Sequence, residues 1–323
     1  MAERSGPRPR VALVGARGMV GVQIAELIGQ RDARHAELKL FGAAGSADAE
    51  GVESGRETLP VAELEAVSEL ASFDIALLAI PAERAAEIAA ARPGPLLIDL
   101  SAAQRRPLDA IVLAAPGLTP PARIAAMKKP GIIGVPHPGA QVIAAILEAL
   151  EIRSGFAAAT ILLGASSRGR EAISGLFNQS AELLNARLQL GDEETQTAFN
   201  VFLPPAADEL AEVIAAQVAT LLVVGGPNLI VQIAQAPAFL GAAVALFLPP
   251  GAESAQWAMR LRTAPGIILV ETAEASGFID AAAQEAVIAK LTITPAGAAI
   301  WCVFDAARLA ALTAIWIAET VSI

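Results

Sequence analysis

Short blocks of consecutive apolar residues alternate with alanine-rich stretches over the first half of the chain. The runs at residues 11–14 and 73–80 are typical of strands that are buried on both faces of a parallel sheet. Strands are predicted at residues 11–14, 37–42, 73–80, 96–100, 111–114 and 131–135. Alanine-rich segments at 82–91 and 139–150 predict helices, and the first of them ends before the Pro-Gly-Pro sequence at 93–95. The alternation predicts an α/β fold with a Rossmann-like, doubly wound parallel sheet.

The pattern changes after residue 150, where the apolar runs become longer and few helices separate them. A helix is predicted over residues 206–224. Strands are predicted at residues 156–165, 195–203, 229–235, 243–248, 289–294 and 299–304. This order predicts an α+β domain built on a mixed or antiparallel sheet.

The stretch from residue 213 to residue 252 contains no charged residue, so a membrane span has to be considered. The Gly-Gly-Pro-Asn sequence at 225–228 is a turn signal, and Gln232, Gln235 and Pro237 interrupt the most apolar part. The stretch is therefore too broken for a spanning helix. We interpret it as part of a sheet that lies in the interior or at an interface, and we expect no membrane partner.

Glycines mark the end of the first predicted strand. Gly15 permits a tight turn, Gly18 lets a phosphate approach the start of a helix, and Gly21 lets that helix lie close to the strand. The spacing is G-x-x-G-x-x-G, whereas the strict dinucleotide fingerprint is G-x-G-x-x-G. Arg17 lies inside the turn, where it would pair with a phosphate or fill the space of one. The alternative is a glycine-rich turn that binds nothing.

The predicted cofactor-binding residues follow from this turn and from the next strand. They are Gly15, Arg17, Gly18, Met19, Val20 and Ser46. The strand at 37–42 leads into 43–47 without an Asp or Glu for a ribose hydroxyl and without an Arg or Lys for a 2′-phosphate. We therefore expect NADP or NAD to be weakly held, and this part of the sequence does not select between them.

The composition is apolar and acidic. A length of 323 residues is enough for two domains. Hydrophobic residues make up 54% of the chain and charged residues only 17%, so we expect a second subunit to cover part of the surface. A net charge of −10 and a pI near 4.8 argue against a nucleic-acid partner. The polar segment at residues 1–9 does not resemble a signal peptide, and we expect a cytoplasmic protein.

Thiol and imidazole groups are scarce. The only cysteine, Cys302, lies in an apolar, strand-like run and is interpreted as a buried structural thiol. His137, between two prolines, is a candidate base or ligand, although a turn residue is the favoured interpretation. His35 lies in a polar loop and is expected to be solvated. Because these residues are far apart in the sequence, no metal site is predicted.

Six segments, taken in order, resemble the aspartate-semialdehyde dehydrogenases and, more distantly, the acyl-phosphate reductases. Residues 15–21 read Gly-Ala-Arg-Gly-Met-Val-Gly, which is similar to the family's Gly-Ala-Thr-Gly-x-Val-Gly turn. Residues 97–105 contain the family's Ile-Asp-x-Ser-x-x-x-Arg run, which ends at Arg105. The other four segments are residues 131–137, 166–172, 235–241 and 304–308.

The resemblance implies two domains and a particular chemistry. A dinucleotide-binding domain would span residues 1–138 and be completed by a C-terminal helix at 305–323, and a substrate-type and dimerisation domain would span 139–304. In the family, a cysteine thiolate attacks the aldehyde, a base takes protons, hydride passes to NADP, and phosphate cleaves the thioester. The resemblance also makes Arg105 an anion-binding candidate, because its family counterpart contacts the phosphate on the substrate side.

The chain departs from this chemistry at the positions that carry it. Pro138 stands where the nucleophilic cysteine is expected, and Ala242 stands where the base histidine is expected. The place of the orienting glutamine is held by Leu163 or Gly164, and that of the substrate-gripping arginine by Gln235. Losing nucleophile, base and orienting group together removes the acyl-enzyme route. No catalytic residue is therefore assigned.

Three hypotheses follow. The favoured one is a catalytically silent protein that binds a nucleotide or associates with other proteins, as a homodimer through the apolar sheet or in association with an active homologue. The second is an oxidoreductase that acts on an aldehyde or acyl-phosphate with NAD(P) by a mechanism without cysteine. The third is a structural remnant without a ligand.

Overall fold

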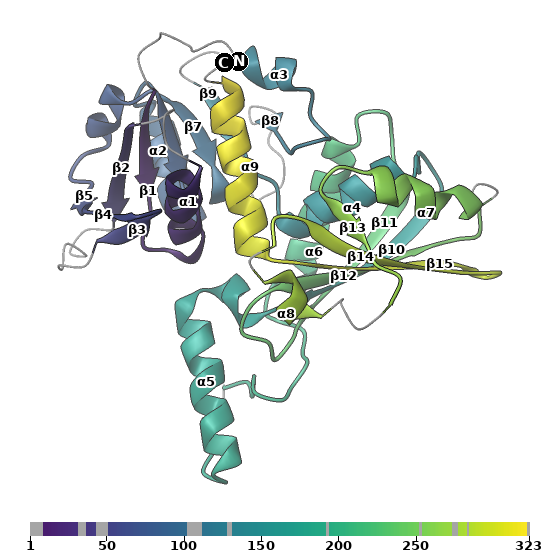
Figure 1. The fold of residues 1–323 in the computed structure, drawn as a ribbon. Helices are drawn as coiled ribbons and strands as arrows, with labels where there is room; N and C mark the ends of the chain where they lie inside the picture. Colours follow the sequence, from purple (N-terminus) through teal and green to yellow (C-terminus); the bar gives the residue numbers. More distant parts are fainter. Residues whose placement is uncertain are drawn as a thin grey trace. The chain divides into compact units, whose positions relative to one another are not determined.

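The computed structural model describes residues 9–31, 37–42, 51–101, 112–127, 131–191, 194–251, 254–272, 277–282 and 284–321. The chain divides into two compact units (Figure 1). The first consists of Met1–Pro136 and Ala310–Ile323, and the second of His137–Leu309. Each unit contains its own large sheet and is described separately.

The sheet of the first unit has seven strands in the order β5-β2-β1-β6-β7-β9-β8. The pairs along this order are parallel, which confirms the prediction of a parallel sheet. The strands are β1 (Arg10–Val14), β2 (Glu37–Gly42), β5 (Val61–Glu63), β6 (Ile75–Leu78), β7 (Leu96–Asp99), β8 (Val112–Leu113) and β9 (Gly131–Gly134). β6 and β7 are buried along their whole length, as their apolar residues indicate, and β7 ends at the buried Asp99.

Helices cover both faces of this sheet, which explains why its central strands are mostly apolar (Figure 1). Successive side chains of a strand point to opposite faces. Leu13 packs in one apolar cluster with residues of α1 (Met19–Gln30) and α9 (Ala306–Val321). Val14 packs in a second cluster with residues of α2 (Ala82–Ala91). The result is the doubly wound arrangement that the alternating pattern predicts.

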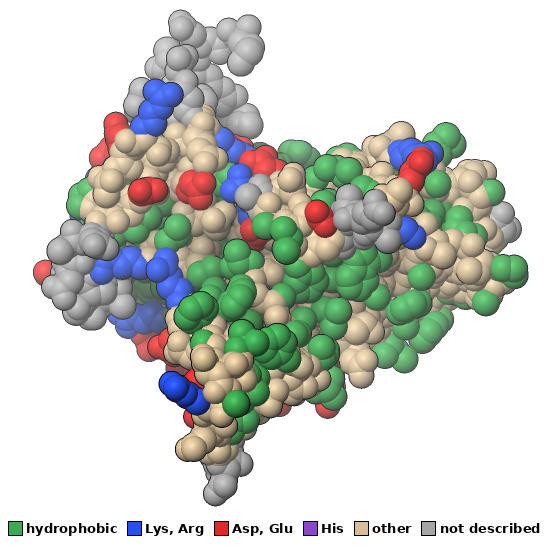
Figure 2. All heavy atoms as spheres, turned by 60° about the horizontal axis from the view of Figure 1, so that its bottom comes forward, with side chains coloured by type: hydrophobic (Ala, Val, Ile, Leu, Met, Phe, Trp, Pro, Cys, Tyr) green, Lys and Arg blue, Asp and Glu red, His purple; other side chains and the backbone are tan. Residues whose placement is uncertain are grey.

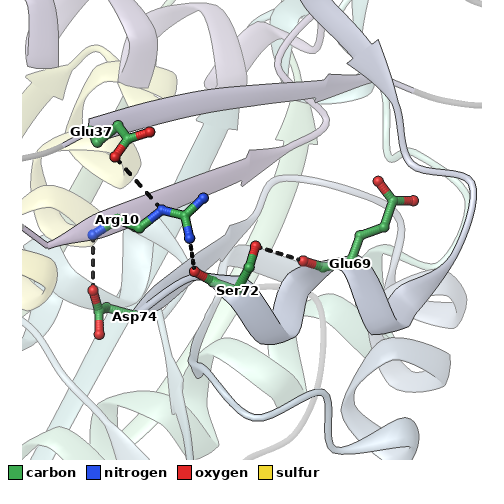
Figure 3. Close-up of polar contacts among 5 residues, drawn as sticks. All are labelled: Arg10, Glu37, Glu69, Ser72 and Asp74. Carbon is green, nitrogen blue, oxygen red and sulfur yellow. Dashed lines mark hydrogen bonds and ion pairs between the residues drawn. The ribbon is translucent and has the colours of Figure 1, made fainter.

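Arg10, at the start of β1, makes polar contacts with residues at the amino-terminal ends of the neighbouring strands β2 and β6 (Figure 3). Its backbone N–H donates to Asp74 Oδ2 at 2.9 Å, and its guanidinium donates to the Ser72 carbonyl oxygen at 2.6 Å. The Arg10 Nε lies 3.6 Å from Glu37 Oε2, and the guanidinium carbon lies 5.1 Å from the centre of the Phe73 ring. Because these charges are largely exposed, they contribute little stability and mainly fix the strand ends. The opposite end of β1 leads into the glycine turn.

Several short elements of the first unit were not predicted. They are the antiparallel pair β3 (Val52–Ser54) and β4 (Glu57–Leu59), the edge strand β5, the 3₁₀ helix η1 (Val67–Ser72) and the helix α3 (Pro121–Ala125). Each is too short for hydrophobic periodicity to reveal.

The second unit contains a mixed sheet of six strands in the order β11-β10-β12-β15-β14-β13. The β10–β11 and β13–β14 pairs are parallel and the other three are antiparallel, which confirms the predicted mixed sheet. The strands are β10 (Phe156–Leu163), β11 (Asn228–Gln235), β12 (Ala242–Leu248), β13 (Ile267–Leu269), β14 (Val287–Thr294) and β15 (Gly297–Phe304).

Helices α4 (Pro138–Ala149), α6 (Ala207–Leu221) and α7 (Ser254–Thr263) lie on one side of this sheet (Figure 1). α4 contacts β12, α6 contacts β11, and α4 also packs against the other two helices. The short helix α8 (Phe278–Ala281) covers part of the opposite face, and α5 (Arg170–Leu184) projects away from the sheet. The two faces of the sheet are therefore covered unequally.

The predicted strand at residues 195–203 is wrong. This segment is irregular, and its pairing with the sheet in the described residues is a single antiparallel bridge between Phe202 and Gln235. The Gln179 side chain of α5 accepts hydrogen bonds from the N–H groups of Thr197 and Ala198, at 2.7 and 3.3 Å. A side chain thus binds the backbone donors that a strand ladder would use.

The uncharged stretch at 213–252 forms most of α6, the turn that follows it, and strands β11 and β12. Among the described residues, none of the helices combines the length and apolar character that crossing a membrane requires.

Candidate functional site

The turn after β1 is closed by backbone hydrogen bonds and by glycine geometry. The N–H groups of Gly15 and Ala16 donate to the Phe41 carbonyl oxygen at 2.8 and 3.1 Å, and the Gly18 N–H donates to the Gly15 carbonyl oxygen at 3.0 Å. Gly15 has a φ of +89°, and a Cβ atom there would lie 2.2 Å from the Ala79 carbonyl oxygen. This position therefore accepts glycine alone.

The start of α1 presents backbone donors without a competing side chain. Gly18 is the N-cap residue, no side chain caps the helix, and the first turn contains no acidic residue. The first N–H groups of a helix, here including those of Met19 and Val20, have no intrahelical acceptor. Gly18 is exposed, whereas Arg17, Met19 and Val20 are half-buried. The helix dipole and these donors together form a site for an anion such as a phosphate.

Two predicted site residues, Ser46 and Arg105, lie outside the described residues, as does His35, which was expected to be solvated. Just before Arg105, the Ser101 N–H and hydroxyl both donate to Asp99 Oδ1, at 2.9 and 2.6 Å. These buried contacts close the end of β7.

In the second unit, strands β10, β11 and β12 bring together positions that the resemblance links to catalysis. Leu163 pairs with Gln235 in the parallel register and with Ala242 in the antiparallel register. The Gly164 N–H donates to the Gly241 carbonyl oxygen at 3.0 Å. The positions are neighbours, as a common active site would require, yet their side chains offer only an amide and apolar groups. This cluster supplies neither a nucleophile nor a base.

His137 is the N-cap residue of α4. Its Nδ1 accepts a hydrogen bond from the Gly139 N–H at 3.0 Å, and its backbone N–H donates to Gln217 Oε1 at 2.7 Å. The residue is buried, and burial lowers the pKa of the imidazole to about 4. Pro138 follows as the first residue of the helix, where a missing N–H costs nothing. His137 is therefore neutral near pH 7 and serves as a helix cap.

The depressed pKa of His137 predicts a loss of stability in acid. The unfolded imidazole binds a proton below a pKa near 6.5, while the folded imidazole resists protonation until about pH 4. The free energy of unfolding should therefore fall by up to about 3 kcal/mol as the pH drops through this window. His137→Asn retains a capping acceptor but removes the titrating imidazole. The free energy of unfolding of this variant, measured in urea, should therefore fall less than that of the native chain as the pH drops through this window. An equal fall in both proteins would contradict this assignment.

Cys302 lies in β15 and is fully buried, as the sequence predicts. It pairs in register with Val244 and Ala289. Desolvation raises the pKa of its thiol to about 12, so the thiolate that would act as a nucleophile is almost absent at neutral pH.

Sequence analysis missed Gln217, whose side chain is fully buried and binds the backbone before α4. The partners are 80 positions apart. The one available signal was that Gln217 is a polar residue in a mostly apolar stretch of the predicted helix at 206–224. That signal does not indicate which group Gln217 binds.

A doubly wound parallel sheet whose first strand ends in a glycine turn is the architecture of dinucleotide-binding domains. Residues 10–124 match the model of the family described as semialdehyde dehydrogenase, NAD binding domain. The USG-1 protein homolog of Pseudomonas aeruginosa is 31% identical over 258 residues, which cover 74% of this chain and 73% of that protein.

Solved structures share the fold of the whole chain. A probable aspartate-semialdehyde dehydrogenase from Pseudomonas aeruginosa has a TM-score of 0.83 and 28% identity, with coverage of 97% of this chain and 98% of the other. Aspartate semialdehyde dehydrogenase II from Vibrio cholerae has the same fold, with a TM-score of 0.83, 24% identity and coverage of 98% of both chains. The chain belongs to the semialdehyde dehydrogenase family, and its fold is that of the aspartate-semialdehyde dehydrogenases.

Proposed function

We propose that this protein is a nucleotide-binding, dimeric member of the family that does not carry out the acyl-enzyme reaction. The observation that carries the proposal is the state of its single cysteine. The family reaction needs a thiolate that can reach an aldehyde. Cys302 is fully buried and its pKa is raised to about 12, while Pro138 holds the first position of α4. With no accessible thiol, the protein would act through binding and association.

The β1–α1 turn supports nucleotide binding by this protein. It lies within residues 10–124, which match an NAD-binding domain. The turn offers backbone N–H groups and a helix dipole to a pyrophosphate, and it has no acidic residue to repel one. We propose that NADP or NAD is the ligand and that backbone contacts hold it weakly.

Gly18→Asp tests this turn without removing the fold. An aspartate at the N-cap is compatible with the helix but would place a negative charge where the phosphate lies. Gly18→Asn is the matched neutral control. In calorimetric titrations with NADP and NAD, we expect the Asp variant to bind at least about tenfold more weakly than the Asn variant. Equal affinities would place the nucleotide elsewhere, and no binding by the native chain would contradict a nucleotide-dependent role.

Catalytic silence is tested with the same preparation. Purified protein is mixed with aspartate semialdehyde, phosphate and NADP, and the formation of NADPH is followed by absorbance. We expect no turnover above a reaction without protein. Turnover that a Cys302→Ala variant retains would overturn the proposal and favour an oxidoreductase that works on an aldehyde without cysteine, and His137→Ala would then test the His137 imidazole. Turnover that Cys302→Ala loses would overturn the proposal and restore a cysteine-dependent reaction.

An apolar sheet face supports the proposed homodimer. Side chains that share a face in the strand register include Ala158, Ile230, Phe247 and Ala299, on four adjacent strands. Ile230 is 61% exposed and Phe247 is 48% exposed. Figure 2 shows hydrophobic side chains gathered over the second unit on the side opposite α4, α6 and α7. Contiguous apolar surface of this kind is typical of subunit interfaces.

Phe247→Arg should weaken this dimer. In a symmetric dimer, one substitution places the charge in the interface twice, and burying it without a partner is unfavourable. We expect sedimentation velocity to show at least about a tenfold increase in the dimer dissociation constant. Met259→Arg, at a 63% exposed position on α7, is the matched control and should leave the dimer intact. A monomeric native protein, or equal behaviour of both variants, would contradict the proposal and leave association with an active homologue to be tested.

A further inference from the structure

Among the described strands, β11 is the one long strand at the edge of a large sheet. It has eight residues, whereas the other three edge strands, β5, β8 and β13, have two or three. An edge strand presents unpaired backbone N–H and C=O groups, and proteins commonly protect such a strand by shortness, charge or proline. β11 contains neither a charged residue nor a proline. Its length and sequence therefore leave this edge open to pairing with another strand.

The direction of the backbone groups along β11 follows from the hydrogen bonds at its two ends. At the start, the Asn228 N–H donates to the Gly155 carbonyl oxygen at 2.8 Å. At the other end, the Ala236 N–H donates to the Leu163 carbonyl oxygen at 2.8 Å. Both acceptors belong to β10 or adjoin it, and backbone groups alternate in direction along a strand. The even-numbered residues of β11 therefore face β10, and the odd-numbered residues face outward.

The chain itself covers the outer side of β11 at one end. There Gln235 and Phe202 exchange two backbone hydrogen bonds, with N···O distances of 2.8 and 3.2 Å. Pro204 and Pro205 follow, and because proline has no N–H they cannot extend this antiparallel ladder. Ile233 is still buried. The covered part of the edge therefore includes only the last residues of the strand.

The stretch from residue 228 to residue 232 is accessible. Its residues are exposed or half-buried, and Ile230 is 61% exposed. Leu229 and Val231 direct their N–H and C=O groups outward, and these groups have no hydrogen-bond partner in the part of the chain that the structure describes. An extended chain can add a strand to a sheet at such a place.

This accessible stretch is complementary to itself. In an antiparallel pair, residues whose backbone groups point toward the partner lie opposite each other. When two copies pair about Ile230, Leu229 of each copy lies opposite Val231 of the other, and the two pairs form four backbone hydrogen bonds. Ile230 then lies opposite Ile230, and Asn228 lies opposite Gln232. An apolar pair between two amide pairs is a favourable set of cross-strand neighbours.

Charge and exposure favour a second copy as the partner. Residues 213–252, which include most of α6 and all of β11, contain no charged residue, so like charges do not meet when two copies pair. Val223 and Val224, in the turn before β11, are 69% and 75% exposed. Val201 and Leu203, at the covered end of the strand, are each 60% exposed. Antiparallel pairing brings the turn of each copy toward the other copy's covered end, so that both apolar groups lose exposure to water.

We propose that two copies of this chain pair through residues 228–232 of β11, antiparallel and with Ile230 on the two-fold axis. This pairing goes beyond the proposed function, because the proposed homodimer uses the apolar face of the sheet and this pairing uses its edge. Five residues of each copy form a small interface, so we expect the edge pair to need a higher protein concentration than the face dimer. The two pairings together give assemblies larger than a dimer.

Disulfide trapping in the full chain tests the register. Each variant carries one new cysteine in a Cys302→Ala background, and covalent dimers formed under mild oxidation are measured on non-reducing gels. Residues that lie opposite each other without hydrogen bonds are about 4.5 Å apart at Cα, which suits a disulfide. Ile230→Cys should therefore cross-link at least about tenfold faster than Gln232→Cys, which is the matched exposed control. A mixture of Gln232→Cys and Asn228→Cys should form a covalent dimer that neither variant forms alone.

A proline at an outward position tests the edge without disturbing the bonds to β10. Val231→Pro removes an outward N–H, and proline is tolerated at such positions of edge strands. The substitution is made in the Phe247→Arg background, where the face dimer is weakened. We expect sedimentation velocity to show at least about a tenfold increase in the dissociation constant of the remaining pair. Leu269→Pro is the matched control and should leave this constant unchanged. It lies at an outward position of β13 on the opposite edge, since the next residue donates its N–H to β14.

Three results would overturn the proposal. The first is that Ile230→Cys cross-links no faster than Gln232→Cys. The second is that the mixture of Gln232→Cys and Asn228→Cys gives no covalent dimer. The third is that Val231→Pro and Leu269→Pro have equal dissociation constants while both remain folded by circular dichroism. If Val231→Pro does not fold, the cysteine variants still decide. Phe247→Arg acts on the face and Val231→Pro on the edge, so the two proposals fail independently.

Discussion

Gly21→Ala is expected to lower the free energy of unfolding by about 3 kcal/mol or more and to abolish nucleotide binding. A Cβ atom at Gly21 would lie 2.1 Å from the Gly15 carbonyl oxygen and 2.9 Å from Ala16 Cα. Both are backbone atoms of the turn, so no side chain can move aside to make room. Alanine favours the helix over glycine by only about 1 kcal/mol, so the steric clash dominates.

Gly18→Ala is the matched control for this prediction. Gly18 has an extended backbone with a φ of −67°, and a Cβ there would lie 3.2 Å from the nearest backbone atom, the Gly15 carbonyl oxygen. A shift of a few tenths of an ångström accommodates it, so we expect a change in stability within about 1 kcal/mol. Urea unfolding of both variants makes the comparison. Equal stability of Gly21→Ala and the native chain would show that α1 does not lie against the turn as described.

The Cys302 thiol is expected to react with Ellman's reagent about a thousandfold or more slowly in the folded protein than in urea. The thiolate is the reactive form, and burial raises the pKa of this thiol from 9.0 to about 12. Each pKa unit lowers the thiolate fraction about tenfold near neutral pH, and exclusion of the reagent slows the reaction further.

This reaction also bears on the proposed lack of catalysis. Absorbance at neutral pH would follow the release of thionitrobenzoate from folded and unfolded protein. Cys302→Ala gives the background, since the chain has no other thiol. Rapid stoichiometric labelling of the folded protein would contradict the buried state of Cys302 and would reopen a cysteine-dependent mechanism.

Local pattern was sufficient for the elements that are buried on defined faces. The predicted bounds 37–42 and 82–91 coincide with β2 (Glu37–Gly42) and α2 (Ala82–Ala91). The second half of β2 is a buried run that precedes the small residues at 43–47, and α2 ends before Pro-Gly-Pro, which is a stop signal for a helix. The glycine turn could also be predicted, because glycine is one of the few residues that readily adopt a positive φ such as that of Gly15.

The segment at 195–203 shows where local pattern fails. Its residues suit a strand, but Gln179, on another element, takes its backbone donors. The cap of α4 depends in the same way on Gln217, which is 80 positions from its partner. Nothing in a short window of sequence indicates which distant side chain will compete for a backbone group. These contacts exist only after the chain has folded.

The sequence by itself determined the parallel sheet of the first unit, the mixed sheet of the second and the glycine turn after β1, because burial and backbone geometry restrict the residues at these positions. It also determined which reactive groups the chain lacks. Only the tertiary structure decided that His137 caps a helix, that Gln217 binds the backbone before α4, and that residues 195–203 form no strand. These properties depend on the contacts and solvent exposure of a side chain, which are set by residues far away in the sequence.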